Sequence, residues 1–183
     1  MSLVSMTQEE MVNHFEQIKE VVNKLLIDVS VEEFNNRQNK KKWSAAECVE
    51  HLNIAAQIYL SNIPKLPKRS VVLIDEETKI SARLFAKMFI GLSGPKVKVK
   101  IKSPKSMMSE EKNYGKDIID DFFSLQEEFL KILVSVDSEQ LKRIKVPWPT
   151  FELMKFTLGE VMMLTIAHEL RHLNQAESAI DSQ

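Results

Sequence analysis

Apolar residues recur at helical spacing along four long stretches of the chain. In the first stretch they are three or four positions apart and share one helical face: Met11, Phe15, Ile18, Val22 and Leu25. The pattern predicts four long helices, over residues 7–27, 44–62, 110–136 and 157–180. Pro64 and Pro67 end the second of these helices, because proline interrupts the helical hydrogen bonds.

Three of the four predicted helices begin with a capping box. In this motif the N-cap hydroxyl accepts a hydrogen bond from the backbone three residues later, and a glutamate at that later position bonds back to the N-cap amide. The chain has this spacing in three pairs: Thr7 and Glu10, Ser44 and Glu47, and Thr157 and Glu160. These pairs predict where the helices begin.

The helix count indicates an all-α fold, a four-helix bundle that forms a single domain over residues 1–183. The connection over residues 64–105 is too long for a tight bundle loop, and its apolar spacing predicts an extra helix at 77–91. A short helical turn is predicted at 30–36, and no sheet is expected before the last helix.

Lysine alternates with apolar residues in segment 96–102, as in an extended strand. The lysines either hold an anionic ligand or keep a solvated crossover from pairing with another strand. The second interpretation is the simpler one, and the role of Lys96–Lys105 stays open.

Composition and charge exclude several classes of protein. The net charge is −1, so no overall basic field attracts nucleic acid or an anionic membrane. The sequence has neither a dinucleotide-binding GxGxxG motif nor a P-loop. Cys48 is the single cysteine, and we find no signal peptide and no apolar run near the ~20 residues that span a bilayer. We therefore expect a cytoplasmic protein that has neither nucleic acid nor a membrane as its partner.

Three histidines form a candidate metal site. His168 and His172 are four residues apart on the last predicted helix, which places them on one face about 6 Å apart along the axis. His51 lies on the second predicted helix among apolar neighbours, and we expect it to point inward. Three inward imidazoles are difficult to satisfy separately, whereas one divalent metal ion satisfies a nitrogen of each. We therefore predict a metal site formed by His51, His168 and His172.

Three protein ligands leave a coordination position open, as in catalytic metal sites. That position can hold a water of lowered pKa or a substrate thiol bound as thiolate. The fourth histidine, His14, lies at the edge of the apolar stripe and is not expected to be a ligand. Cys48 is expected to be structural, and Trp43 and Trp148 are expected to pack in the core or at a helix start.

The last helix also contains the metalloprotease motif HExxH, in which Glu169 would be the general base. Only 11 residues follow His172, and Ser178 stands where a metzincin has its third histidine. Glu169 also lies about 100° from His168 around the helix, so it is a weak candidate for the base. The protease is therefore the less favoured alternative.

Two strings in the sequence resemble the DinB-like (YfiT-like) family of metal-dependent enzymes. The first is WSAAECVEHL at 43–52, which is similar to the family element WSxxExxxHL. The second runs from Pro149 to HELRHLNQ at 168–175, and it is similar to the family's PxFxxL segment and HExxHxxQ helix. The resemblance covers most of the chain. One departure is Asn174, where many members have glycine.

The resemblance implies a bundle in up-down-down-up order, with a long crossover between the second and third helices. It implies a zinc or nickel ion on His51, His168 and His172, and members often form homodimers. The implied activity is that of a hydrolase or a thiol transferase that uses water or a low-molecular-weight thiol on a small-molecule substrate. Gln175, one turn after His172, and Glu169 are the candidate catalytic residues. A non-catalytic sensor that binds a metal or small ligand is the alternative from a different class.

Overall fold

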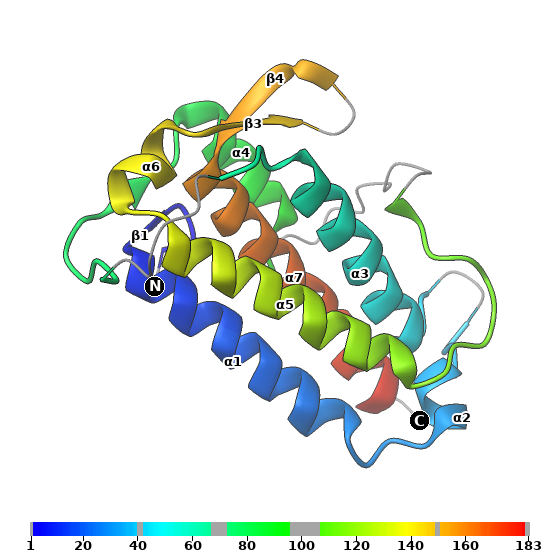
Figure 1. The fold of residues 1–183 in the computed structure, drawn as a ribbon. Helices are drawn as coiled ribbons and strands as arrows, with labels where there is room; N and C mark the ends of the chain where they lie inside the picture. Colours follow the sequence, from blue (N-terminus) through cyan, green and yellow to red (C-terminus); the bar gives the residue numbers. More distant parts are fainter. Residues whose placement is uncertain (1, 40–41, 67–72, 96–106, 149–150, 182–183) are drawn as a thin grey trace.

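The computed structural model describes residues 2–39, 42–66, 73–95, 107–148 and 151–181. Four long helices lie side by side (Figure 1): α1 (Gln8–Leu26), α3 (Ala45–Asn62), α5 (Asp117–Ser135) and α7 (Leu158–Asp181). Contacts run from α1 to α5, from α5 to α3, from α3 to α7 and from α7 back to α1. The core lies between these helices and contains fully buried aromatic side chains such as Phe15 and Phe129. The prediction of a mainly helical fold is confirmed.

The three predicted capping boxes are present. Thr157 N donates to Glu160 Oε2 at 2.8 Å, and Glu160 N donates back to Thr157 Oγ1 at 3.2 Å. Thr7 and Ser44 make the equivalent pairs of hydrogen bonds at the starts of α1 and α3. The predicted turn at 30–36 is also confirmed as α2 (Val31–Asn35), which Ser30 caps in the same way.

The extra helix of the long connection begins later than predicted. It is α4 (Leu84–Ser93), and it starts at Leu84 rather than at residue 77. Asp75 Oδ1 accepts hydrogen bonds from the backbone N of Glu77 and Thr78, at 3.0 and 2.8 Å, which forms a turn. The chain then continues as β2 (Ile80–Ser81), which pairs with β1 (Ser5–Met6). A turn and a strand therefore occupy the first part of the predicted helix.

The third long helix begins at Asp117 rather than at residue 110. Asn35 Oδ1 accepts from Tyr114 N at 2.7 Å, and Asn35 Nδ2 donates to Tyr114 O at 2.9 Å. These two bonds use both backbone groups of Tyr114 and hold the segment against the end of α2, so the helix starts only after it.

The expectation that no sheet precedes the last helix is wrong. The strands β3 (Lys145–Trp148) and β4 (Phe151–Thr157) form an antiparallel hairpin that leads directly into α7 (Figure 1). The first strand has four residues, one of them Pro147, and the pairing is irregular between Pro147 and Trp148, so the alternation is too brief to predict a sheet. The short helix α6 (Ser138–Arg143) was also not predicted.

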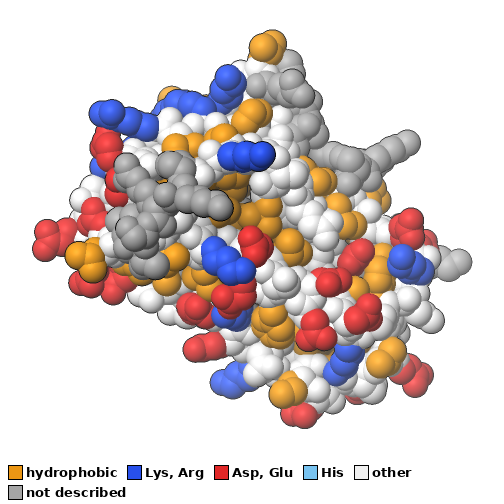
Figure 2. All heavy atoms as spheres, viewed as in Figure 1, with side chains coloured by type: hydrophobic (Ala, Val, Ile, Leu, Met, Phe, Trp, Pro, Cys, Tyr) orange, Lys and Arg blue, Asp and Glu red, His pale blue; other side chains and the backbone are white. Residues whose placement is uncertain are grey.

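Charge is unevenly distributed over the molecule. On the face shown in Figure 2, Lys and Arg side chains gather towards the end that carries the β3–β4 hairpin, and Asp and Glu side chains spread over the long helices. Among the described residues, none of the helices combines the length and the apolar character needed to cross a membrane. The predicted strand at 96–102 and the rest of Lys96–Lys105 lie outside the described residues.

Candidate metal centre

A partly buried ion pair fixes the beginning of α3. Glu47 is buried and closes the capping box with Ser44, and it also accepts a hydrogen bond from Arg37 Nε at 2.7 Å. Arg37 Nη1 donates to Glu111 Oε1 at 2.8 Å. His51 follows Glu47 by one helical turn, so this anchor sets the position of His51 in the interior.

A second ion pair anchors α7. Glu160 is buried, and Arg83 donates to its carboxylate through Nε at 2.8 Å and Nη2 at 2.6 Å. Farther along α7, Arg171 Nη1 donates to the carbonyl of Leu92 at 3.0 Å. These contacts tie α7 to α4 before and within the histidine pair, and they fix the rotation of the helix that carries it.

The three predicted histidines meet in the interior. One ring nitrogen from each of His51, His168 and His172 lies within 4.8 Å of the other two. The Nε2 atoms of His51 and His168 are 3.1 Å apart. Two nitrogens on one tetrahedral zinc ion are about 3.3 Å apart, so this pair already has suitable spacing. His51 and His172 are buried, and His168 is partly exposed as a residue.

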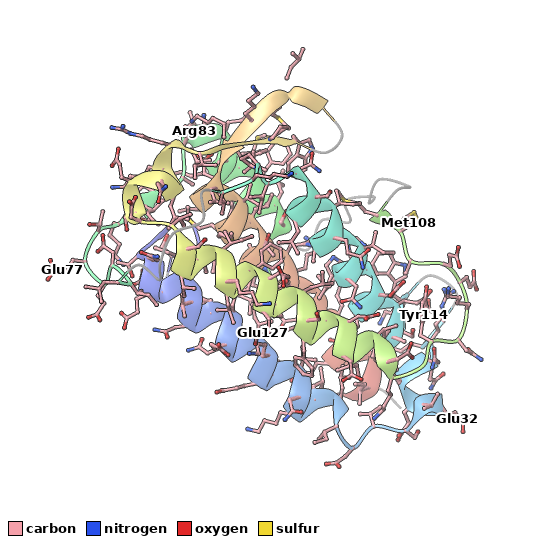
Figure 3. All side chains as sticks on the ribbon, viewed as in Figure 1. Glu32, Glu77, Arg83, Met108, Tyr114 and Glu127 are labelled. Carbon is pink, nitrogen blue, oxygen red and sulfur yellow. The ribbon has the colours of Figure 1, made fainter. Side chains whose placement is uncertain are left out.

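The carbonyl of Met107 lies behind His51 and accepts a hydrogen bond from its Nδ1. This contact places the proton on Nδ1, so the lone pair of Nε2 faces His168. A backbone carbonyl behind an imidazole is typical of metal-binding histidines. Figure 3 shows the neighbouring Met108 on the segment that passes α3 before α5 begins.

The electrostatic environment keeps all three imidazoles neutral. Burial lowers the pKa of His51, although the hydrogen bond to Met107 opposes this effect. Burial, together with electrostatic repulsion between the protonated form and its neighbours His51 and Arg171, lowers the pKa of His168 to about 3. Burial also lowers the pKa of His172 well below its ordinary value. Neutral imidazole is the form that binds metals, so these residues fit a divalent ion at neutral pH.

His172 provides a further test of this fit. Its Nδ1 atom is buried and has no hydrogen-bond partner of normal geometry among the described residues. Buried polar atoms in folded proteins are rarely left without a partner. A shared ion, with small rotations of the rings around it, satisfies the cluster better than three separate imidazoles do.

Trp43 covers two of the three histidines. Its ring centroid lies 4.9 Å from that of His51 and 5.6 Å from that of His172, and its ring is within 23° of parallel to His172. Sequence reasoning assigned Trp43 to packing and missed this role as a wall of the site. The signal was its place next to the capped start of the helix that carries His51.

Glu169 lies in the core of the bundle and accepts a hydrogen bond from Gln126 Nε2 of α5 at 2.8 Å. Burial raises the pKa of Glu169 to about 8, although the bond from Gln126 opposes this effect. A carboxyl group that is largely protonated at neutral pH is poorly suited to act as a general base. The structure therefore disfavours the protease mechanism that the HExxH string suggested.

The other candidates lie at the edge of the site or outside it. Gln175 is exposed and interacts with His172, where its side chain opposes the lowering of the histidine pKa. His14 lies on α1 and is not part of the cluster. Cys48 is a buried free thiol whose pKa is raised by burial, which fits the expected structural role.

Comparison with known proteins supports the resemblance noted in the sequence. The family model of the DinB superfamily matches residues 14–176, a range that contains all three histidines and Trp43. No match was found among curated proteins or among solved structures. The family match covers most of the chain, and this protein therefore belongs to the DinB superfamily.

Proposed function

We propose that this protein is a metal-dependent enzyme in which His51, His168 and His172 hold one zinc or nickel ion. The observation that carries the proposal is the convergence of three neutral imidazoles, with 3.1 Å between Nε2 of His51 and Nε2 of His168. When bound, such an ion supplies a water or thiolate of lowered pKa. We infer that water or a low-molecular-weight thiol attacks a small electrophilic substrate, in a hydrolysis or a thiol transfer.

The surrounding residues support a role in binding that substrate. His168 is partly exposed, so a small molecule can approach the cluster from its side. Trp43 offers an apolar indole beside His51 and His172. Gln175 is exposed one turn after His172, where its amide can hydrogen-bond a bound substrate. The buried rings of His51 and His172 keep bulk water from the other side of the site.

We also propose that the four long helices form a bundle in up-down-down-up order. The closed ring of contacts through α1, α5, α3 and α7 supports this arrangement. A homodimer and a cytoplasmic location belong to the same proposal and rest on the sequence alone. Sedimentation velocity of the purified protein tests the dimer.

Elemental analysis of purified protein tests the metal site. We expect one metal ion per chain in the parent, and a severe loss in His51→Ala, because a ligand and its contact with Met107 are removed. His14→Ala is the matched control, because His14 lies outside the cluster. Equal metal content in the parent and His51→Ala would refute the site.

Turnover by the metal-loaded protein tests the reaction. One arm uses glutathione with a chromogenic aryl halide, and the other uses a p-nitrophenyl ester. Activity in either arm that is lost with a chelator and in His51→Ala supports the enzyme. Full metal content without turnover favours the sensor, and casein hydrolysis that Glu169→Gln abolishes would favour the protease.

A further inference from the structure

The outward face of α4 is apolar. Ala86 and Ile90 on its inner face are buried, and α4 packs against α7. The outer face exposes large apolar side chains at helical spacing, with exposed fractions of 87% for Leu84, 49% for Phe85, 51% for Met88 and 39% for Leu92. Contiguous apolar surface of this kind usually marks a place where another surface binds.

The charged residues of the described stretch around α4 are all basic. Residues 78–95 contain Lys79, Arg83 and Lys87 and no Asp or Glu; Lys79 pairs with Glu10 and Arg83 with Glu160, and Lys87 forms no ion pair within the described part of the chain. Lys87 is exposed at the edge of the apolar face. On the neighbouring hairpin, Lys155 is exposed and its carbonyl accepts a hydrogen bond from Arg83 Nη2 at 2.8 Å. In the described residues, the apolar face of α4 is therefore bordered by the exposed cations Lys87 and Lys155.

We propose that α4 docks this protein on an anionic lipid surface. Leu84, Phe85, Met88 and Leu92 would enter the boundary between head groups and acyl chains, and Lys87 would pair with lipid phosphates. An apolar face bordered by basic residues is the chemistry of helices that bind membrane interfaces. Ten residues are too few to span a bilayer, so α4 lies in the plane of the surface.

Charge complementarity favours lipid over other occupants of this face. The described stretch 78–95 has no acidic residue, so the same face of a second copy offers no acidic partner for Lys87, whereas a lipid phosphate does. A nucleic acid would neutralise the basic residues but leave the apolar side chains in water. The earlier expectation of no membrane partner used the net charge of the whole chain, whereas this proposal rests on how that charge is distributed.

Co-sedimentation of the full chain with vesicles tests the proposal. We expect binding to mixed phosphatidylcholine and phosphatidylglycerol vesicles, weak binding to pure phosphatidylcholine, and release by high salt. The double variant Leu84→Ser and Met88→Ser should bind the mixed vesicles about tenfold more weakly or worse. Lys87→Glu should weaken binding only to the vesicles that contain phosphatidylglycerol. Ile27→Ser is the matched control, because Ile27 follows α1 and its exposed fraction of 61% lies between those of Leu84 and Met88.

The same experiment can overturn the proposal. It fails if the parent does not bind the mixed vesicles, or if the double variant binds them as tightly as the parent does. It also fails if the parent ignores vesicles and self-associates in sedimentation velocity, while the double variant does not. All the substitutions replace exposed side chains, and unchanged thermal unfolding and metal content show that each variant is folded.

Discussion

Glu169 should make this protein less stable as the pH rises from 5 to 8, and the substitution Glu169→Gln should remove this dependence. Its Oε1 accepts a hydrogen bond from Gln126 at 2.8 Å, and its Oε2 is buried without a partner among the described residues. Burial raises the pKa of Glu169 from 4.5 to about 8 in the folded state. The folded protein therefore keeps a proton that the unfolded chain has lost at neutral pH.

The size of the effect follows from proton linkage. Below pH 4.5 both states hold the proton, and the stability is fully present. Between pH 4.5 and 8 the free energy of unfolding falls by up to about 1.4 kcal/mol for each pH unit, and the loss is complete about one pH unit above 8. From pH 5 to pH 8 the loss is about 3 to 4 kcal/mol, which is a large part of the stability of a typical domain.

The substitution Glu169→Gln tests this reasoning, because an amide keeps the shape of the protonated acid and does not titrate. We expect the variant to match the parent within about 1 kcal/mol at pH 5 and to exceed its stability by about 3 kcal/mol at pH 8. Urea unfolding with a chelator present at both pH values removes any contribution from metal binding. Glu177→Gln, which removes an exposed carboxylate from the same helix, is the matched control for the substitution. Parallel pH profiles for the parent and Glu169→Gln would refute the reasoning.

Three further predictions concern packing, charge and the metal site. Gly159→Ala should lower the free energy of unfolding in urea by about 1 to 3 kcal/mol, because the new Cβ would lie 2.8 Å from Ile80 Cγ2. At Gly91 a new Cβ would meet nothing within 4 Å, so Gly91→Ala should stabilise α4 by up to about 1 kcal/mol. Arg83→Met should lower the free energy of unfolding by about 3 kcal/mol, because it leaves Glu160 buried without its cation. Lys131→Met breaks an exposed ion pair with Glu128 and should lower it by under about 1 kcal/mol. Equal losses in the two variants would contradict this prediction. The Trp148→Phe variant keeps Trp43 as its one tryptophan, and Ni²⁺ should quench its fluorescence because Trp43 lies beside His51. The double variant Trp148→Phe and His51→Ala should show no saturable quenching.

Local signals in the sequence predicted the helix starts that local contacts decide. Each capping box joins residues three positions apart, so the sequence contains both partners of the bonds at Thr7, Ser44 and Thr157. The starts of α4 and α5 depend instead on contacts with distant parts of the chain. Tyr114, for example, bonds with Asn35, which lies 79 residues away. Apolar periodicity extends across such positions and does not reveal that a distant residue hydrogen-bonds the backbone groups there.

The features of the candidate site likewise divide into those that local sequence predicts and those that only tertiary contacts create. The spacing of His168 and His172 follows from helix geometry, and the apolar neighbours of His51 indicated that it points inward and joins them. The carbonyl of Met107 could not be predicted, because a backbone carbonyl is present at every position and only the fold brings this one to His51. The position of Trp43 over two of the rings is likewise a result of tertiary packing.

The HExxH string shows why a motif needs its surroundings before it indicates a reaction. Its two histidines are four residues apart, a spacing that lets any helix direct two imidazoles at one point. What separates a protease from other uses of the string is the third ligand and the state of the glutamate. Here the third imidazole comes from His51 on α3, and Glu169 is turned to Gln126 in the core, where its raised pKa keeps it protonated. The same five residues therefore contribute two candidate ligands to the site and one buried acid to the packing of the bundle.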